Sequence, residues 1–153
     1  MAYTAPYLAM LDTTTQAITV GGTPQLVTFN TTILASKIAV TSSSRFTFNE
    51  AGTYQLISNF QLDGSGVGKI HDLWARVNGT DVTNSLSKNT LVNTNDEKDI
   101  THVINFTVTA GQYVELWQNG DSTTLSLLAV AAGVTPTRPA SNSIHIVIQR
   151  KPV

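Results

Sequence analysis

The chain has 153 residues, of which only 12% are charged, and its 9 Lys and Arg against 10 Asp and Glu give a formal net charge of -1. Its cations are too few and too scattered for a basic stripe, so nucleic acid is not an expected partner. The chain has no cysteine, which excludes disulfides, thiolate metal sites and cysteine nucleophiles. It also lacks a secretion signal and any apolar run of about 18 residues. We therefore expect one soluble domain with no membrane insertion and no cleaved leader.

The first half of the chain alternates apolar and polar residues and never follows the period of a helix. The clearest strand runs from Thr53 to Leu62, with Tyr54 and Leu56 on one face and Gln55 and Ile57 on the other. Less regular strands are expected earlier, at 16–20, 25–29, 37–40 and 45–48.

The second half repeats this pattern. A glycine-rich loop leads to a strand from Ile70 to Val77, which ends at the Asn78-Gly79 turn signal. Further strands are expected at 100–108, 113–117, 125–132 and 143–150, with Thr135–Pro139 as a stiff extended connector before the last. About nine or ten short strands at this spacing predict an all-β, two-sheet antiparallel sandwich or a barrel.

No residues form a recognisable catalytic or metal-binding motif. His71, His102 and His145 lie far apart and lack metal-binding spacing. Asn95–Asp99 contains three carboxylates, which Ca²⁺ could use, but the EF-hand spacing is absent and a solvated loop is the expected structure. Ser65 lies between glycines without the pattern of a nucleophile elbow, which indicates a turn. We expect no enzymatic activity and no cofactor or metal.

Two strands carry apolar residues on both faces. Trp74 lies on the face opposite Leu73, and Trp117 lies on the face opposite Leu116. A sheet normally exposes one face to water, so this pattern suggests that oligomerisation or docking covers the second face.

A second candidate contact comes from the outward residues of three strands. Each strand places one aliphatic residue, Ile57, Val103 or Val147, among polar ones. If the strands are neighbours, these residues form a small apolar spot ringed by amides, hydroxyls and the His145 imidazole. This spot fits a subunit contact; a partly exposed sheet face would show the same pattern.

Several motifs together resemble the TNF/C1q-like jelly rolls, in particular short C1q-like structural proteins of tailed phages, including marine ones. The resemblance covers nearly the whole chain and is carried by Asp12–Gln16, Phe46–Phe48 with Ala51–Tyr54, Leu73–Thr80, Gly111–Leu116 and Thr135–Pro139. It implies a ten-stranded jelly roll that assembles as a homotrimer through its inner sheet, with Ile57, Val103, His145 and Val147 near the threefold axis. No catalysis is implied.

The same resemblance implies a place in a virion that is assembled in the host cytoplasm. Cellular relatives carry a stalk and this chain shows none, so we expect residues 1–14 to form an N-terminal arm ahead of a jelly roll at 15–153. The arm would attach to the particle through Tyr3, Pro6, Tyr7 and Leu8.

Two functions stay open at this point. The first is a capsid decoration or cement protein, with itself and phage capsid or tail proteins as partners. The alternative is the receptor-binding tip of a tail or head fibre, with a host surface receptor as partner and the loops Gly64–Gly68 and Asn89–Asp99 as the contact.

Overall fold

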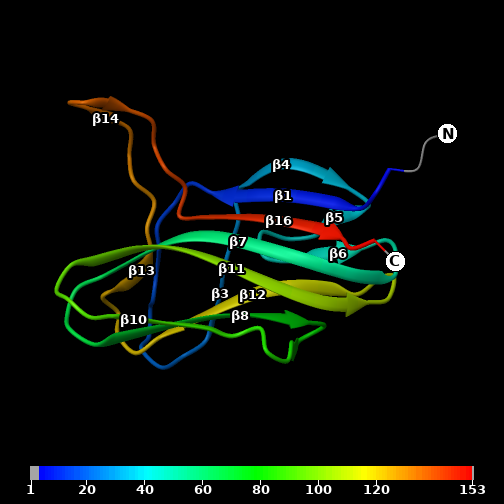
Figure 1. The fold of residues 1–153 in the computed structure, drawn as a ribbon, viewed down its shortest axis with the longest axis horizontal. Coiled ribbons are helices and arrows are strands. Elements are labelled where there is room, and N and C mark those ends of the chain that lie inside the picture. The colour runs from blue at the N-terminus through cyan, green and yellow to red at the C-terminus, as the bar shows by residue number, and fades with distance from the viewer. Residues whose placement is uncertain (1–3, 153) are drawn as a thin grey trace.

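The computed structural model describes residues 4–152 and has an all-β fold, with 59% strand, no helix and antiparallel sheets. The prediction of an antiparallel β-sandwich is confirmed (Figure 1). In the described part of the chain no helix is long and apolar enough to cross a membrane.

One seven-stranded sheet, sheet A, contains the two longest strands. β7 (Gly52–Gly64) pairs with β11 (Asp96–Val108) along one side for its full length. On its other side it pairs with β16 and, further along, with β13. The remaining strands extend the sheet away from β7: β16 (Ile144–Arg150), β1 (Tyr7–Asp12), β4 (Thr31–Ser36), β13 (Leu125–Leu127) and β2 (Gln16–Ala17).

The other seven-stranded sheet, sheet B, is centred on two long strands. β8 (Lys69–Val77) and β12 (Tyr113–Gly120) pair with each other, and Trp74 lies opposite Trp117. β10 (Ser87–Leu91) and β9 (Thr80–Asp81) pair with β8, β6 (Phe46–Phe48) and β3 (Gln25–Leu26) pair with β12, and β5 (Ile38–Val40) pairs with β6 at the edge. The predicted two-residue turn at Asn78-Gly79 is confirmed, and both residues have positive φ, 47° and 79°.

Aromatic side chains join the two sheets. Phe48 of β6 and Tyr54 of β7 belong to different sheets, and their ring centroids lie 4.5 Å apart. Phe106 of β11 packs on Phe48 at 5.7 Å, and Phe29 packs on Phe46 at 5.3 Å. The Tyr54 hydroxyl donates to the Glu50 carbonyl at 2.9 Å, so the buried ring has its polar atom satisfied.

Side-chain hydrogen bonds organise the chain between the end of β1 at Asp12 and its entry into sheet B at β3. The buried Asp12 carboxylate accepts a hydrogen bond from the Thr14 backbone N–H at 2.6 Å, which is an Asx-type turn. The Gln16 side chain then donates to the Thr28 carbonyl and accepts from the Thr28 N–H, both at 2.9 Å. These bonds take the place of a regular ladder, which explains why β2 (Gln16–Ala17) and β3 (Gln25–Leu26) have only two residues each.

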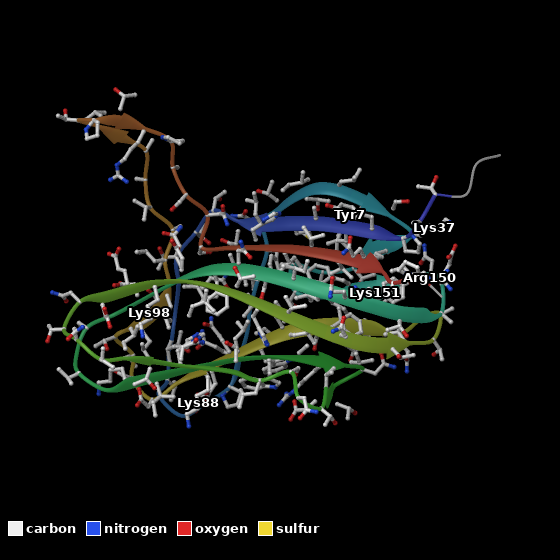
Figure 2. All side chains as sticks on the ribbon, viewed as in Figure 1. Tyr7, Lys37, Lys88, Lys98, Arg150 and Lys151 are labelled. Atoms are coloured by element: carbon white, nitrogen blue, oxygen red, sulfur yellow. The ribbon has the colours of Figure 1, made fainter. Side chains whose placement is uncertain are left out.

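The described ends of the chain lie together at one end of the sandwich, and the loops 65–68 and 92–95 lie at the other, which we call the loop end (Figure 1). Lys37 and Arg150, beside the chain ends, both bind Glu50, at 2.7 and 3.0 Å (Figure 2). Lys88 and Lys98 lie away from this end. The labelled cations are therefore divided between distant parts of the surface.

The segment 125–140 differs from the sequence expectation. The strand predicted at 125–132 ends at Leu127. The expected extended connector at Thr135–Pro139 is instead part of a hairpin, β14 (Gly133–Val134) and β15 (Thr137–Arg138), which projects away from both sheets (Figure 1). The sequence did not predict a strand in this segment because of its prolines. Pro136 and Pro139 lie on either side of the two paired residues of β15, so they do not interrupt the pairing.

Candidate interaction surfaces

The outer face of sheet A carries one continuous apolar row. The registers place Val103 opposite Ile57, Ile57 opposite Val147, Val147 opposite Ala9 and Ala9 opposite Leu34. We call these five residues the apolar row. The predicted adjacency of Ile57, Val103 and Val147 is thus confirmed. At the two ends of the row Val103 and Leu34 are 47% and 55% exposed, so about half of each residue is left uncovered by the described chain.

Polar residues border the apolar row on both sides. On one side the Gln55 amide donates to Asn105 at 3.3 Å and accepts from Gln149 at 3.4 Å, which forms a ladder of amides across three strands. On the other side the registers align His145 with Asn59 of β7. An apolar centre with a border of uncharged polar residues has the composition of a protein contact.

A hollow of about 330 Å³ opens beside the apolar row, toward the loop end. Its outer-face lining comes from β7, β11, β16 and the root of the projecting hairpin: Asn59, Gln61, Asp99, Thr101, Asn142 and His145. Gln61 holds the hairpin root, because its amide donates to Ser141 Oγ at 2.7 Å and to the Asn142 carbonyl at 2.9 Å. His145 also lines this hollow and lies two residues before Val147 on the same face of β16.

The N-terminal residues do not form the predicted arm. β1 is an internal strand of sheet A, paired with β16 on one side and β4 on the other. Leu8 is a fully buried core residue and Pro6 is also buried, so neither can contact a particle without unfolding β1. Tyr7 is half-buried on the outer face of sheet A, opposite Gln149 (Figure 2). Tyr3 lies outside the described residues. A domain boundary at residue 14 is thus wrong, because Tyr7–Asp12 is a strand of sheet A whose consecutive apolar residues do not show a strand's alternation.

The outer face of sheet B carries the two tryptophans, and arginine covers them. The Arg76 guanidinium carbon lies 4.3 Å from the Trp117 ring centroid and 5.6 Å from that of Trp74. Asp81 accepts from both Arg76 Nε, at 2.6 Å, and Trp74 Nε1, at 2.8 Å. The hydrogen bond from Arg76 holds the pKa of the Asp81 carboxyl below its usual value.

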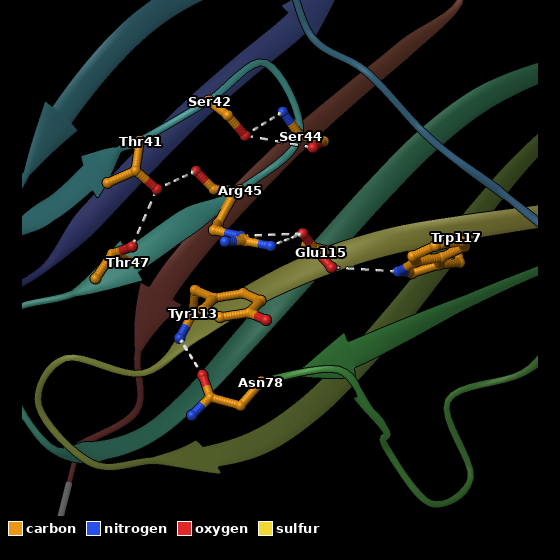
Figure 3. Close-up of polar contacts among 9 residues, drawn as sticks. All are labelled: Thr41, Ser42, Ser44, Arg45, Thr47, Asn78, Tyr113, Glu115 and Trp117. Atoms are coloured by element: carbon orange, nitrogen blue, oxygen red, sulfur yellow. Dashed lines mark hydrogen bonds and ion pairs between the residues drawn. The ribbon is translucent and has the colours of Figure 1, made fainter.

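A second arginine, Arg45, covers another aromatic ring of β12, that of Tyr113 (Figure 3). Arg45 lies 3.8 Å over the Tyr113 ring and donates from Nε and Nη2 to Glu115 Oε1, at 3.0 and 2.9 Å. The other carboxylate oxygen of Glu115 accepts from Trp117 Nε1 at 3.4 Å. Glu115 is only 4% exposed, so its carboxylate is largely withdrawn from water, whereas the Arg45 side chain remains partly exposed.

These contacts account for the two-sided apolar pattern of β8 and β12. The aromatic rings are covered by Arg45 and Arg76 of the same chain, so they do not require a partner protein. Sequence reasoning missed this because the arginines lie on different strands from most of the rings they cover. Their role follows only from the cross-strand registers.

His71 lies between the sheets rather than on a surface. It is fully buried, its Nε2 lies 3.1 Å from Gln118 Oε1, and its ring packs 6.1 Å from that of Phe60. Burial lowers the pKa of His71 below its ordinary value of 6.5, and the Gln118 hydrogen bond and the Asp72 charge oppose this only in part. Burial also lowers the pKa of the half-buried His102.

His71 makes the stability of the fold depend on pH. Folded His71 stays neutral below pH 6.5, whereas the unfolded chain takes up a proton there, so acid favours unfolding. We expect the free energy of unfolding to fall by up to about 1.4 kcal/mol per pH unit for this group as pH decreases from 6.5 toward the folded-state pKa. In urea denaturation at pH 7.5, 6.5 and 5.5, His71→Gln, which keeps a donor for Gln118, is expected to show a shallower decline than the wild type. Equal slopes would contradict this assignment.

The remaining sequence candidates fall at the loop end. Asp96 lies within β11 rather than in a loop, and its carboxylate accepts from the backbone N–H of Val92 at 3.0 Å. Among residues 4–152, no three His, Asp or Glu side chains gather closely enough to hold a metal ion. Ser65 lies in a turn with Gly66 and Gly68 at positive φ, and no helix follows, as the sequence predicted.

The two loops proposed for receptor contact lie side by side. The Gly68 N–H donates to the Leu91 carbonyl at 2.8 Å, and Gly64 pairs with Asp96. They form one continuous surface at the loop end, opposite the ends of the described chain (Figure 1). A comparison of the chain with models of known protein families and with curated proteins finds no match.

Proposed function

We propose that this chain is a non-enzymatic structural protein of a tailed-phage virion, which works as a homotrimer and decorates or cements the capsid. The observation that carries the proposal is the apolar row on the outer face of sheet A. It is uncharged, bordered by amides and hydroxyls, and partly uncovered by its own chain. The phage origin rests on the motif resemblance alone.

The strand order supports the jelly-roll part of this proposal. In sheet A the central order is β1, β16, β7, β11, and in sheet B it is β6, β12, β8, β10. The chain passes back and forth between the sheets to build these orders, as a double Greek key does. In a TNF/C1q-like trimer the first of these sheets would face the axis, and this is the sheet that carries the apolar row.

A structural role also agrees with the positions of the histidines. His71 is sealed in the core, whereas His145 lies on the outer face of sheet A. Groups on opposite sides of a sheet cannot converge on one substrate.

Sedimentation of the purified chain tests the homotrimer. The expected mass is three times the 16.4 kDa of one chain. A protein that stays monomeric at all accessible concentrations would rule the proposal out.

The receptor-binding tip of a fibre remains the second candidate, favoured by the adjacent loops at the loop end. Counting the protein in purified particles separates the two roles. A decoration protein repeats with the capsid lattice, on the order of hundreds of copies, whereas fibre tips number on the order of dozens or fewer.

A further inference from the structure

The projecting hairpin has almost no packing within its own chain. Every residue from 131 to 140 is exposed except Gly133, which the side chain of Arg138 covers. Val134 near its tip is 87% exposed. Two residue pairs and the bridge between Val130 and Ser141 are the hairpin's own ladder. A two-stranded hairpin of this size is marginally stable in water, so a contact outside the chain would stabilise it.

The charges on the hairpin and beside its root are complementary. Arg138 is the only charged residue of 131–140, and within residues 4–152 it forms no salt bridge with a carboxylate. Asp99, exposed on the rim of the hollow beside the apolar row, has no cationic partner in the same range. The hairpin thus carries one cation without an ion pair in the described chain, and the outer face of sheet A carries the carboxylates of Asp99, Glu97 and Asp63 on the loop-end side of the apolar row.

The position of the hairpin root makes this pairing geometrically suitable for a ring of identical copies. Ser141 and Asn142 lie over Gln61 on the outer face of sheet A, and Asp99 lies opposite Gln61 in the ladder. The hairpin root (Ser141 and Asn142) and Asp99 therefore lie at the same level, or height, along the strand direction. Rotation about an axis parallel to the strands preserves height, and the hairpin extends from its root toward the loop end (Figure 1). Each hairpin therefore meets its neighbour between the level of Asp99 and the loop end.

We propose that the hairpin of residues 131–140 docks on the outer face of sheet A in the neighbouring copy of this chain, on the loop-end side of the apolar row, with Arg138 paired with Asp99 at the hollow. This inference rests on the proposed homotrimer and adds to it a clasp between copies that the sheet contact alone does not supply. In a closed ring each copy gives one hairpin and receives one.

Charge exchange tests the clasp without disturbing the fold, because both residues are exposed. Arg138→Glu and Asp99→Lys are each expected to raise the concentration for half-dissociation of the trimer by roughly tenfold, since three like-charge contacts replace three ion pairs. The double variant Arg138→Glu with Asp99→Lys restores the attraction and should return toward the wild-type value. Lys88→Glu, the same charge change on sheet B, is the matched control and should leave the trimer unchanged.

The absence of cysteine gives a second, direct measurement. In the variant Arg138→Cys with Asp99→Cys, oxidation is expected to link chains into covalent trimers on a non-reducing gel. The control Arg138→Cys with Lys88→Cys should give none. A wild-type trimer in which the charge variants change nothing and no covalent trimer forms would overturn the clasp while leaving the homotrimer intact. A monomeric wild type would overturn the homotrimer, and the clasp with it.

Discussion

Val147→Asp is expected to convert the proposed trimer into monomers. Val147 lies at the middle of the apolar row, between Ile57 and Ala9. The substitution would bring three carboxylates into one desolvated contact, and the penalty should reach about 4 kcal/mol per trimer, or roughly a thousandfold in the association constant. Sedimentation equilibrium over a wide concentration range measures it directly.

The monomer that results should keep its fold, because the Val147 side chain points away from the core. Val67→Asp is the matched control, since Val67 is 70% exposed in the loop after β7 and outside the row. It introduces the same charge and should leave the trimer intact. A Val147→Asp protein that still sediments as a trimer would show that sheet A is not the subunit contact.

Arg45→Ala should be the most destabilising change on the outer face of sheet B. It leaves the Glu115 carboxylate, which is 4% exposed, without its guanidinium and also removes the cation that lies over Tyr113. We expect the free energy of unfolding to fall by about 2–3 kcal/mol, somewhat less than for a fully buried pair, because the Arg45 side chain is itself 43% exposed. Urea denaturation at neutral pH provides the measurement.

Arg76→Ala is the matched comparison on the same sheet. Its carboxylate partner, Asp81, has a side chain 64% exposed and stays hydrated when the arginine is removed. The loss should therefore be smaller, about 1 kcal/mol, and come mainly from uncovering Trp117. Equal losses for the two variants would mean that the burial of Glu115 has no energetic importance. Adding Glu115→Gln to Arg45→Ala should recover part of the loss, since the buried charge is then gone.

Strict alternation made the central strands predictable from the sequence. Thr53–Leu62 corresponds to β7, and alternation placed Ile57, Val103 and Val147 each on the outward side of its strand. That they lie together depended on these strands being neighbours, which the registers show. Period-two patterns specify faces strongly because a shift of one residue would bury polar side chains.

The strands that the sequence missed lie where tertiary contacts override local pattern. β4 is exposed along nearly its whole length, and its register shifts opposite Ala9 and Met10, so no clean alternation marks it. β1 contains Leu8, Ala9 and Met10 in succession, all buried, because its outer face is also covered at Ala9. The packing of Arg76 on the tryptophans could not be predicted from the sequence either, since it depends on which strands become neighbours.

The position of β16 has a consequence for how the chain reaches its native state. β16 lies between β1 and β7, and Leu8 pairs with Ile148 across nearly the full sequence. During synthesis β1 can pair early with β4, but its second partner leaves the ribosome about 140 residues later, and the facing edges of β1 and β7 stay open until then. Sheet A closes in a late step, so a nascent chain stalled before Ile144 would present two unsatisfied strand edges to chaperones and to other nascent copies.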